Sequence, residues 1–512
     1  MRAMTLLAVG LGLAVAAPAG AKMLRTNIVA DPAMIDPITY SELVAGDVIG
    51  NIYEGFVGLD KDAKVVPALA TKWEALPGNL GFRFTLREGV KFHSGRTLGA
   101  KDVKWSFEQI MKPGAKGGLT TGYLKVLAGL KEYQDGTAKE ISGLVVVAPN
   151  VIEVRFTAPD VLFPIYPFHI MDSGIVEEHG ATWWTKASAG TGPHRFQSWN
   201  RGQSVQLVAH KDYWGGAPKI DGVSFMIVPD DNTAVSQFEA GELDLVYLGG
   251  AVARRVLREA KFKDNLMTVP AAQVQYLGMN QNLYEPFRNI KVREAVCIAI
   301  DRDGMVRGLF GGAAFPLYGQ VTPGVAGYNP AVPKIVHDPA RARQLLAEAG
   351  YPDGKGLPPV KISSTEPNKA ELAYYADQLK KVLGMQVEVD VVERATFIKA
   401  MNAGEVAFFP WGWSAGYPDA MYFLSQMWHS ASPYNRPRWK NAEFDRLIDQ
   451  ARGIADNEAR YKLYNQAEEV LLKDWGTCGT TVRMQIALKQ KSVEGVVLTP
   501  FRFNAFAGVV VK

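Results

Sequence analysis

The segment from Gly404 to Gln426, GEVAFFPWGWSAGYPDAMYFLSQ, carries side chains suited to holding a molecule rather than to breaking a bond. Trp411, Trp413 and Tyr417 offer large, rigid contact areas, and Asp419 adds one charge that could orient a ligand. We interpret the segment as the wall of a solute-binding cleft. Since buried aromatic residues are usually structural, packing inside a core is the alternative interpretation.

The remainder of the chain lacks the motifs of the common enzyme classes. The patterns H-E-x-x-H, C-x-x-C and G-x-x-x-x-G-K-[ST] are absent, and G-x-S-x-G occurs only within the aromatic segment, as Gly412-Trp413-Ser414-Ala415-Gly416. The seven histidines are scattered without the spacing of metal ligands. We therefore expect no catalytic residue, no metal site and no cofactor, and an exported hydrolase is the alternative from another class.

The N-terminus has the features of a secretory signal peptide. Arg2 gives a positive start, Thr5 to Ala17 form an apolar run, and Ala19-Gly20-Ala21 is a small-x-small cleavage site. The apolar run is shorter than the roughly 20 residues of a membrane span. We expect cleavage after residue 21 and a periplasmic protein that is not inserted in the membrane.

Composition limits the partners and the architecture. A chain of 512 residues exceeds what one hydrophobic core usually supports, which predicts more than one lobe. The formal charge of +4 is not gathered in blocks, which argues against nucleic acid and anionic membranes as partners. Cys297 and Cys478 are the two cysteines. They could pair, although the helical pattern around Cys297 favours a small buried hydrophobic residue there.

Strand and helix patterns alternate irregularly along the chain, as in α/β proteins. Residues 82–86, 205–209 and 223–228 are expected strands, and residues 100–111 are an expected helix. Asp338 is expected to cap a helix that ends at Gly350, and a further helix is expected after Asn441.

Six segments in order resemble family 5 extracellular solute-binding proteins, the peptide and nickel binding components of ABC importers. The resemblance covers nearly the whole predicted mature chain, and the segments that carry it are VVPALATKWEALPGNLGFRFTLREGVKFHSGRTLGAKDVKWSFEQI (65–110), GTGPHRFQSW (190–199), DYWGGAPKIDGVSF (212–225), AGELDLV (240–246), YLGMNQN (276–282) and IKVREAVCIAIDR (290–302). The resemblance is specific for the fold and the transport role, and less so for the ligand.

The resemblance implies a two-lobed periplasmic-binding-protein fold of the type II, cluster C kind, with an extra small subdomain and two hinge crossings. Residues 22–56, 185–272 and 490–512 would form the first lobe, residues 57–184 the extra subdomain, and residues 273–489 the second lobe. The lobes would close on a solute by hinge motion. The protein would then dock, as a monomer, on the permease subunits of an ABC transporter.

The resemblance also suggests ligand-binding residues. In peptide-binding members, an Asp in a G-W-x-x-D segment pairs with the α-ammonium of the ligand, whereas this chain has Gly416 at that position. Because a buried unpaired ammonium is costly, either Asp419 substitutes for it or the ligand has no free α-ammonium, as for a metal chelate, haem or a modified amino compound. The expected contact residues are Trp413, Tyr417, Asp419, Trp411, Gly416, Tyr40, Ser41 and Arg436, the last through a ligand carboxylate.

Overall fold

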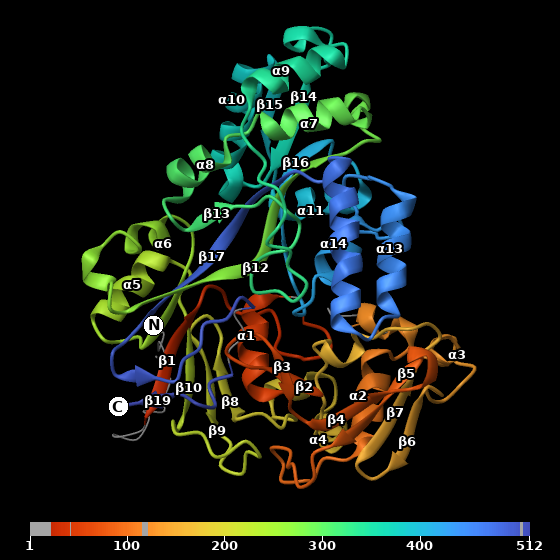
Figure 1. The fold of residues 1–512 in the computed structure, drawn as a ribbon. Helices are drawn as coiled ribbons and strands as arrows, with labels where there is room; N and C mark the ends of the chain where they lie inside the picture. Colours follow the sequence, from red (N-terminus) through yellow and green to blue (C-terminus); the bar gives the residue numbers. More distant parts are fainter. Residues whose placement is uncertain (1–21, 41, 115–120, 502–504) are drawn as a thin grey trace, which may run out of the picture.

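One mixed sheet of eleven strands runs through both lobes of the protein (Figure 1). The computed structural model describes residues 22–40, 42–114, 121–501 and 505–512, so the predicted signal peptide and Ser41 lie outside the described residues. In the first lobe the sheet contains β1 (Met23–Ile28), β8 (His194–Asn200), β9 (Ser204–Ala209), β10 (Gly222–Ile227) and β11 (Leu245–Leu248). In the second lobe it contains β13 (Ala314–Pro316), β14 (Val360–Ser364), β15 (Val387–Val391) and β16 (Phe408–Ser414).

Two long strands, β12 (Leu266–Met279) and β17 (Gly479–Lys489), connect the lobes. They pair with each other, and β17 also pairs with β11 while β12 also pairs with β16. Their register shifts between Pro270 and Val274, opposite Met484 and Val482. A register shift of this kind disrupts the ladder and bends the strand locally, so we expect the hinge implied by the family resemblance to lie in this stretch.

A separate sheet of four antiparallel strands lies beside the first lobe, in the order β4 (Ala70–Ala75), β5 (Gly81–Leu86), β7 (Val151–Arg155) and β6 (Leu144–Ala148). Phe56 and Phe84 stack with ring centroids 3.8 Å apart in its core. The predicted domain boundaries remain predictions, but the strands group as the α/β two-lobed fold requires. Two short pairs complete the strands: β2 (Val57–Leu59) with β3 (Val65–Pro67), and β18 (Val493–Glu494) with β19 (Val510–Val511).

Helices cover these sheets. The first lobe and the small sheet carry α1 (Leu43–Ile52), α2 (Ala100–Ile110), α3 (Leu130–Gln134), α4 (Ser173–His179), α5 (Asp231–Glu239) and α6 (Gly250–Val256). The second lobe carries α7 (Ile290–Ile298), α8 (Arg302–Met305), α9 (Pro339–Glu348), α10 (Lys369–Leu383), α11 (Arg394–Ala403), α12 (Met421–Trp428), α13 (Ala442–Arg452) and α14 (Asn457–Lys473). Over the part of the chain that is described, every helix is too short or too polar to cross a lipid bilayer.

The helices predicted from local signals form where expected. The side chain of Asp338 accepts a hydrogen bond from the N–H of Arg341 at 2.9 Å and so caps α9. Asn441 caps α13 in the same way, by accepting from the N–H groups of Glu443 and Phe444. The strands expected at 82–86, 205–209 and 223–228 correspond to β5, β9 and β10.

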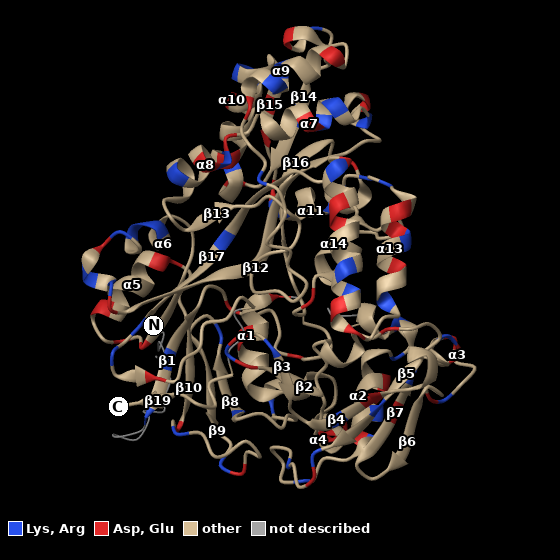
Figure 2. Cartoon of the chain, viewed as in Figure 1, with Lys and Arg blue, Asp and Glu red and all other residues tan. Residues whose placement is uncertain are grey.

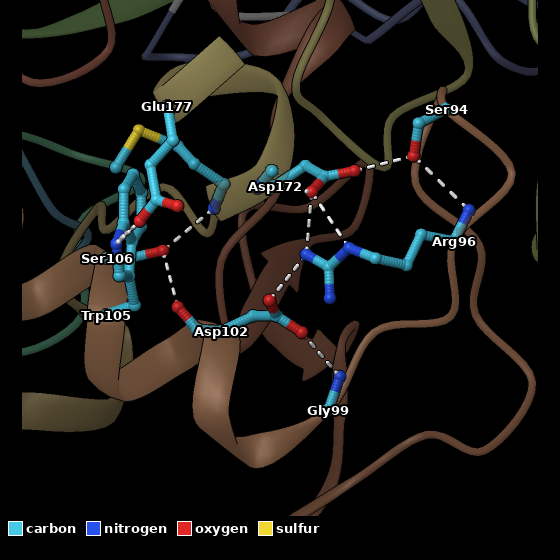
Figure 3. A network of polar contacts seen from close by, with 10 residues as sticks. Ser94, Arg96, Gly99, Asp102, Trp105, Ser106, Asp172 and Glu177 are labelled. Carbon is cyan, nitrogen blue, oxygen red and sulfur yellow. Dashed lines mark hydrogen bonds and ion pairs between the residues drawn. The ribbon is translucent and has the colours of Figure 1, made fainter.

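The segment that carries much of the family resemblance serves the packing of α2 (Figure 3). Asp102 accepts from the N–H of Gly99 at 2.9 Å and closes the first turn of the helix. Arg96 donates to Asp102 at 2.5 Å and to Asp172 at 2.7 Å, which joins α2 to the start of α4. Ser94 also donates to Asp172, at 2.5 Å. These side chains are therefore engaged with one another, which gives this segment a structural role.

Cys297 and Cys478 form a disulfide that joins α7 to the residue before β17, with Cα atoms 5.6 Å apart. Both residues are fully buried. The interpretation of Cys297 as only a small hydrophobic residue was therefore incomplete, since a helical pattern does not reveal a partner 181 residues away.

Candidate functional site

The two tryptophans of the aromatic segment lie on one face of β16. Side chains alternate along a strand, so Trp411 and Trp413 point to the same side. Trp411 packs against Phe397 of α11, with ring centroids 5.8 Å apart. Trp413 packs against Tyr434 at 5.0 Å and Tyr422 at 6.2 Å. Both indoles are only partly buried, so part of each ring is accessible from solvent.

One edge of β16 is paired and the other is open near its C-terminal end. The N–H of Ala415, just after the strand, donates to the carbonyl of Ala272 on β12 at 2.8 Å. Backbone groups alternate between the two edges of an antiparallel strand. Those of Gly412, Ser414 and Gly416 therefore point away from β12. Ser414 and Gly416 are exposed.

The neighbouring strand does not cover this edge. β14 meets β16 only where Ile362 pairs with Phe408, at the beginning of β16. Among the residues that the structure describes, nothing hydrogen bonds to the outward backbone groups of Gly412, Ser414 and Gly416. The end of β16 is thus an unpaired strand edge, beside the aromatic face.

Gly416 of the second lobe lies close to Tyr123, in the segment that follows helix α2. A Cβ placed on Gly416 would lie 2.9 Å from the hydroxyl of Tyr123 and 3.0 Å from the ring of Tyr422. The hydroxyl groups of Tyr123 and Tyr422 are hydrogen bonded to each other. Burial raises the pKa of Tyr422 to about 12, which keeps its hydroxyl neutral in physiological buffers. The atoms nearest to such a Cβ therefore belong to two neutral aromatic side chains.

Tyr417 and Tyr40 are buried among other rings. The ring of Tyr417 is 5.7 Å from that of Tyr123 and 4.9 Å from that of Tyr166, so it joins the second lobe to residues 121–168. Tyr40 packs in the first lobe, and its hydroxyl lies 3.3 Å from His169 Nε2. Burial lowers the pKa of His169 to about 4, so this contact is between neutral groups.

Asp419 is buried in the second lobe with partners of its own. Its Oδ1 accepts from the N–H of Met421 at 2.9 Å at the start of α12. Its Oδ2 lies 3.3 Å from Nη2 of Arg460 on α14. The side chain is 2% exposed, so a ligand ammonium could reach it only if this ion pair opened.

Arg436 is a buried cation under the two tryptophans. Its guanidinium carbon lies 4.5 Å from the ring centroid of Trp411 and 5.5 Å from that of Trp413. Its Nη2 donates to Asn402 at 3.3 Å, whereas Nε and Nη1 have no hydrogen-bond acceptor among the described residues. Burial lowers the pKa of Arg436. The contacts observed are those of a cation–π support for the rings.

This architecture matches a known family of transport proteins. The family model for bacterial extracellular solute-binding proteins, family 5 Middle, matches residues 64–435. The chain belongs to this family. The family 5 model thus covers the small sheet, the hinge strand β12 and the aromatic segment together.

Relatives extend the match over nearly the whole chain. Heme-binding protein A of Haemophilus influenzae is 30% identical over 482 residues, which are 90% of this chain and 87% of that protein. Dipeptide-binding protein DppE of Bacillus subtilis is 28% identical over 501 residues, which are 94% and 90% of the two chains.

Solved structures support the same fold. The unliganded open form of the murein tripeptide binding protein MppA superposes with a TM-score of 0.81, at 22% identity, over 96% of this chain and 98% of that one. HbpA2 of Haemophilus parasuis gives a TM-score of 0.80 at 25% identity, over 96% and 100%. The predicted two-lobed α/β fold of a family 5 solute-binding protein is confirmed.

The structure adds residues to this family 5 site that the sequence pattern did not identify. Tyr123 and Tyr166 precede Tyr417 in the sequence by about 250 residues or more, yet both contact it. Tyr434 packs on Trp413. These tyrosines have no motif or period around them, so no local signal could have revealed them. The open strand edge depends on which strand lies beside β16, and that is equally invisible in the sequence.

Proposed function

We propose that this protein captures a short peptide or a peptide-like solute between its lobes and delivers it to the permease subunits of an ABC importer. It would work in the periplasm as a monomer and would release its ligand chemically unchanged. The observation that carries the proposal is the open edge of β16 at Gly412, Ser414 and Gly416, because an extended peptide backbone is the natural partner of an unpaired strand edge.

The side chains beside this edge suit such a ligand. A peptide added as a strand would gain its affinity from main-chain hydrogen bonds and its orientation from the rings beside it. Trp413 and Tyr422 provide these rings from the second lobe, and Tyr123 approaches from the other side. The relatives named above as dipeptide-binding and murein tripeptide binding proteins support this ligand class.

The surroundings of Gly416 narrow the ligand class. The three heavy atoms nearest to a Cβ placed there belong to Tyr123 and Tyr422, and none is a carboxylate oxygen. Asp419 is engaged with Arg460. We therefore expect weak selection for a free α-ammonium, so that modified or blocked peptides bind as well as free ones. In this proposal Arg436 acts by holding Trp411 and Trp413 rather than by touching the ligand.

Native mass spectrometry of the mature protein, followed by denaturation and identification of the released compound, tests the proposal directly. Calorimetry with trialanine, N-acetyl-trialanine, glutathione and hemin then compares ligand classes. We expect both alanine peptides to bind with similar affinity. Binding of hemin alone, or turnover of any bound peptide, would contradict the proposal.

Variants at Ser414 test the strand edge itself. Ser414→Pro removes the outward N–H without touching the ladder to β12, and Ser414→Ala is the matched control that keeps the N–H. A lost hydrogen bond of this kind costs about 1–3 kcal/mol of binding free energy, which raises Kd by roughly 5-fold to 150-fold. We expect weaker peptide binding only for the proline variant, with a thermal midpoint close to that of the wild type. Equal affinities for the two variants would show that the ligand does not pair with this edge.

A further inference from the structure

A cavity of about 660 Å³, lined by residues of both lobes beside the expected hinge, is rich in arginine. The first lobe contributes α6 and the residues after it, and the second lobe contributes residues 308–310, 367–371 and the hinge strand β17. Its charged lining residues are Arg254, Arg255, Arg258, Glu259, Glu371 and Arg483. Figure 2 shows the basic colour on α6 and on the middle of β17.

This cavity faces away from the aromatic site. Neighbouring residues of a strand point to opposite faces of the sheet. Val482 packs in the core cluster that also contacts Trp411 and Trp413. Arg483, the next residue, stacks instead on Phe310, with its guanidinium carbon 3.8 Å from the ring centroid. The cavity is therefore separate from the open edge of β16.

Two of the four arginines in the cavity already have carboxylate partners. Arg255 pairs with Glu259 at 2.6 Å, and Arg483 pairs with buried Glu371 at 2.5 Å. Arg254 and Arg258 form no ion pair and no side-chain hydrogen bond with any residue in the described part of the chain. The lining thus has two guanidinium groups in excess of its carboxylates.

The two lobes come close together at this cavity. Arg258 belongs to the first lobe, yet its guanidinium lies against Gly311 of the second: a Cβ placed on Gly311 would be 2.0 Å from Nη2 of Arg258. Arg483 lies between Val482 and Met484, which face the register shift of β12. A ligand held here would contact both lobes beside the part of the ladder that must bend.

We propose that this cavity is a binding site for a small polyvalent anion of the phosphate or carboxylate class, and that the bound anion favours the lobe arrangement described here. Guanidinium groups bind such oxyanions through paired hydrogen bonds. A cavity of this size is within the usual range for small-molecule sites. Since the anion would join Arg254 and Arg258 to the wall formed by Arg483, hinge motion would change its affinity, and its binding would shift the hinge equilibrium.

Calorimetry at constant ionic strength tests the site, with pyrophosphate and citrate as probes for the two anion classes. We compare the wild type with Arg254→Gln/Arg258→Gln and with Arg343→Gln/Lys399→Gln, which removes the same charge at exposed positions outside the cavity. We expect the first variant to bind the preferred anion at least about tenfold more weakly and the second to match the wild type. Equal affinity in all three proteins, or no binding by the wild type at millimolar anion, would overturn the proposal.

Hydrogen exchange tests the bridging role without any knowledge of the transported solute. We expect the preferred anion to slow exchange in residues 250–258 and in residues 306–313 together, and to have no such effect in the Arg254→Gln/Arg258→Gln variant. Protection confined to residues 250–258 would show that the anion binds one lobe only and would refute the link to the hinge. Because the probes are inorganic pyrophosphate and citrate, failure here leaves the peptide proposal untouched.

Discussion

Glu468 should make the second lobe less stable as the pH rises. It lies on α14 with 2% of its surface exposed, and its Oε1 accepts from the backbone N–H groups of Gln320 at 2.6 Å and Val321 at 3.3 Å. Burial raises the pKa of Glu468 from 4.5 to about 7, because these two hydrogen bonds only partly offset the loss of water. Folding therefore favours the protonated form.

The size and sign of the effect follow from this shift. Between the unfolded pKa near 4.5 and the folded pKa near 7, the folded chain holds a proton that the unfolded chain has lost. The free energy of unfolding must then fall as the pH rises through this window. A pKa shift from 4.5 to about 7 lowers the free energy of unfolding by about 3 kcal/mol once the pH is above the folded pKa. Below pH 4.5 the side chain is neutral in both states and the penalty disappears.

The substitution Glu468→Gln isolates this contribution, because the amide oxygen can still accept from Gln320 and Val321 but does not titrate. Urea unfolding, followed by tryptophan fluorescence from pH 4.5 to 8.5, gives the free energy of unfolding for both proteins. We expect near-equal stability at pH 4.5 and a variant more stable than the wild type by up to about 3 kcal/mol at pH 8. Other groups titrate in both proteins and cancel in the difference.

Glu469→Gln is the matched control, since it makes the same chemical change one residue along α14 on an exposed side chain. We expect it to change the free energy of unfolding by about 0.5 kcal/mol or less at each pH. The reasoning is refuted if the difference between wild type and Glu468→Gln is constant with pH, or if the wild type is the more stable protein at pH 8.

Two further predictions concern buried links in the second lobe. Asp419→Asn should lower the free energy of unfolding by about 3–5 kcal/mol, because it leaves the buried guanidinium of Arg460 without its carboxylate. Weaker peptide binding at an unchanged free energy of unfolding would instead show that Asp419 contacts the ligand. Replacing Cys297 and Cys478 by serine should lower the free energy of unfolding by about 2–5 kcal/mol, because the unfolded chain is no longer restrained by the disulfide. Urea unfolding of this variant beside the oxidised wild type measures the difference. An unchanged free energy of unfolding would show that the disulfide does not stabilise the fold.

Local signals in the sequence sufficed for much of the fold. The helix after Asp338 was predictable because its cap, its proline and its apolar spacing all lie within a dozen residues. The family resemblance then supplied the two lobes and the hinge crossings, which no local pattern contains. The irregular pairing of Pro270 and Val274 with β17 is set by contacts some 200 residues apart, so it became visible only in the folded chain.

The candidate site was predictable in part for the same reason. Trp411 and Trp413 could be chosen because indoles clustered on one short segment are rare, and the structure places both beside the open edge. The role of Asp419 could not be read from its position after Gly416. Its partner Arg460 lies 41 residues further along the chain, in helix α14. The carboxylate that follows Gly416 in the sequence is therefore buried and already paired with Arg460.

The pairing of Asp419 with Arg460 bears on which ligands the candidate site can distinguish. A strand edge offers alternating N–H and C=O groups, which pair with any extended backbone whatever its side chains. A carboxylate at position 416 would add a preference for a positively charged end, but this chain has Gly416 there, with the neutral ring and hydroxyl of Tyr422 and Tyr123 beside it. In the proposed function, the edge would supply affinity for the backbone, and the rings would supply contact area. Selection among peptides must then come from how their side chains fit against Trp413 and the tyrosines, which is why blocked and free peptides should bind alike.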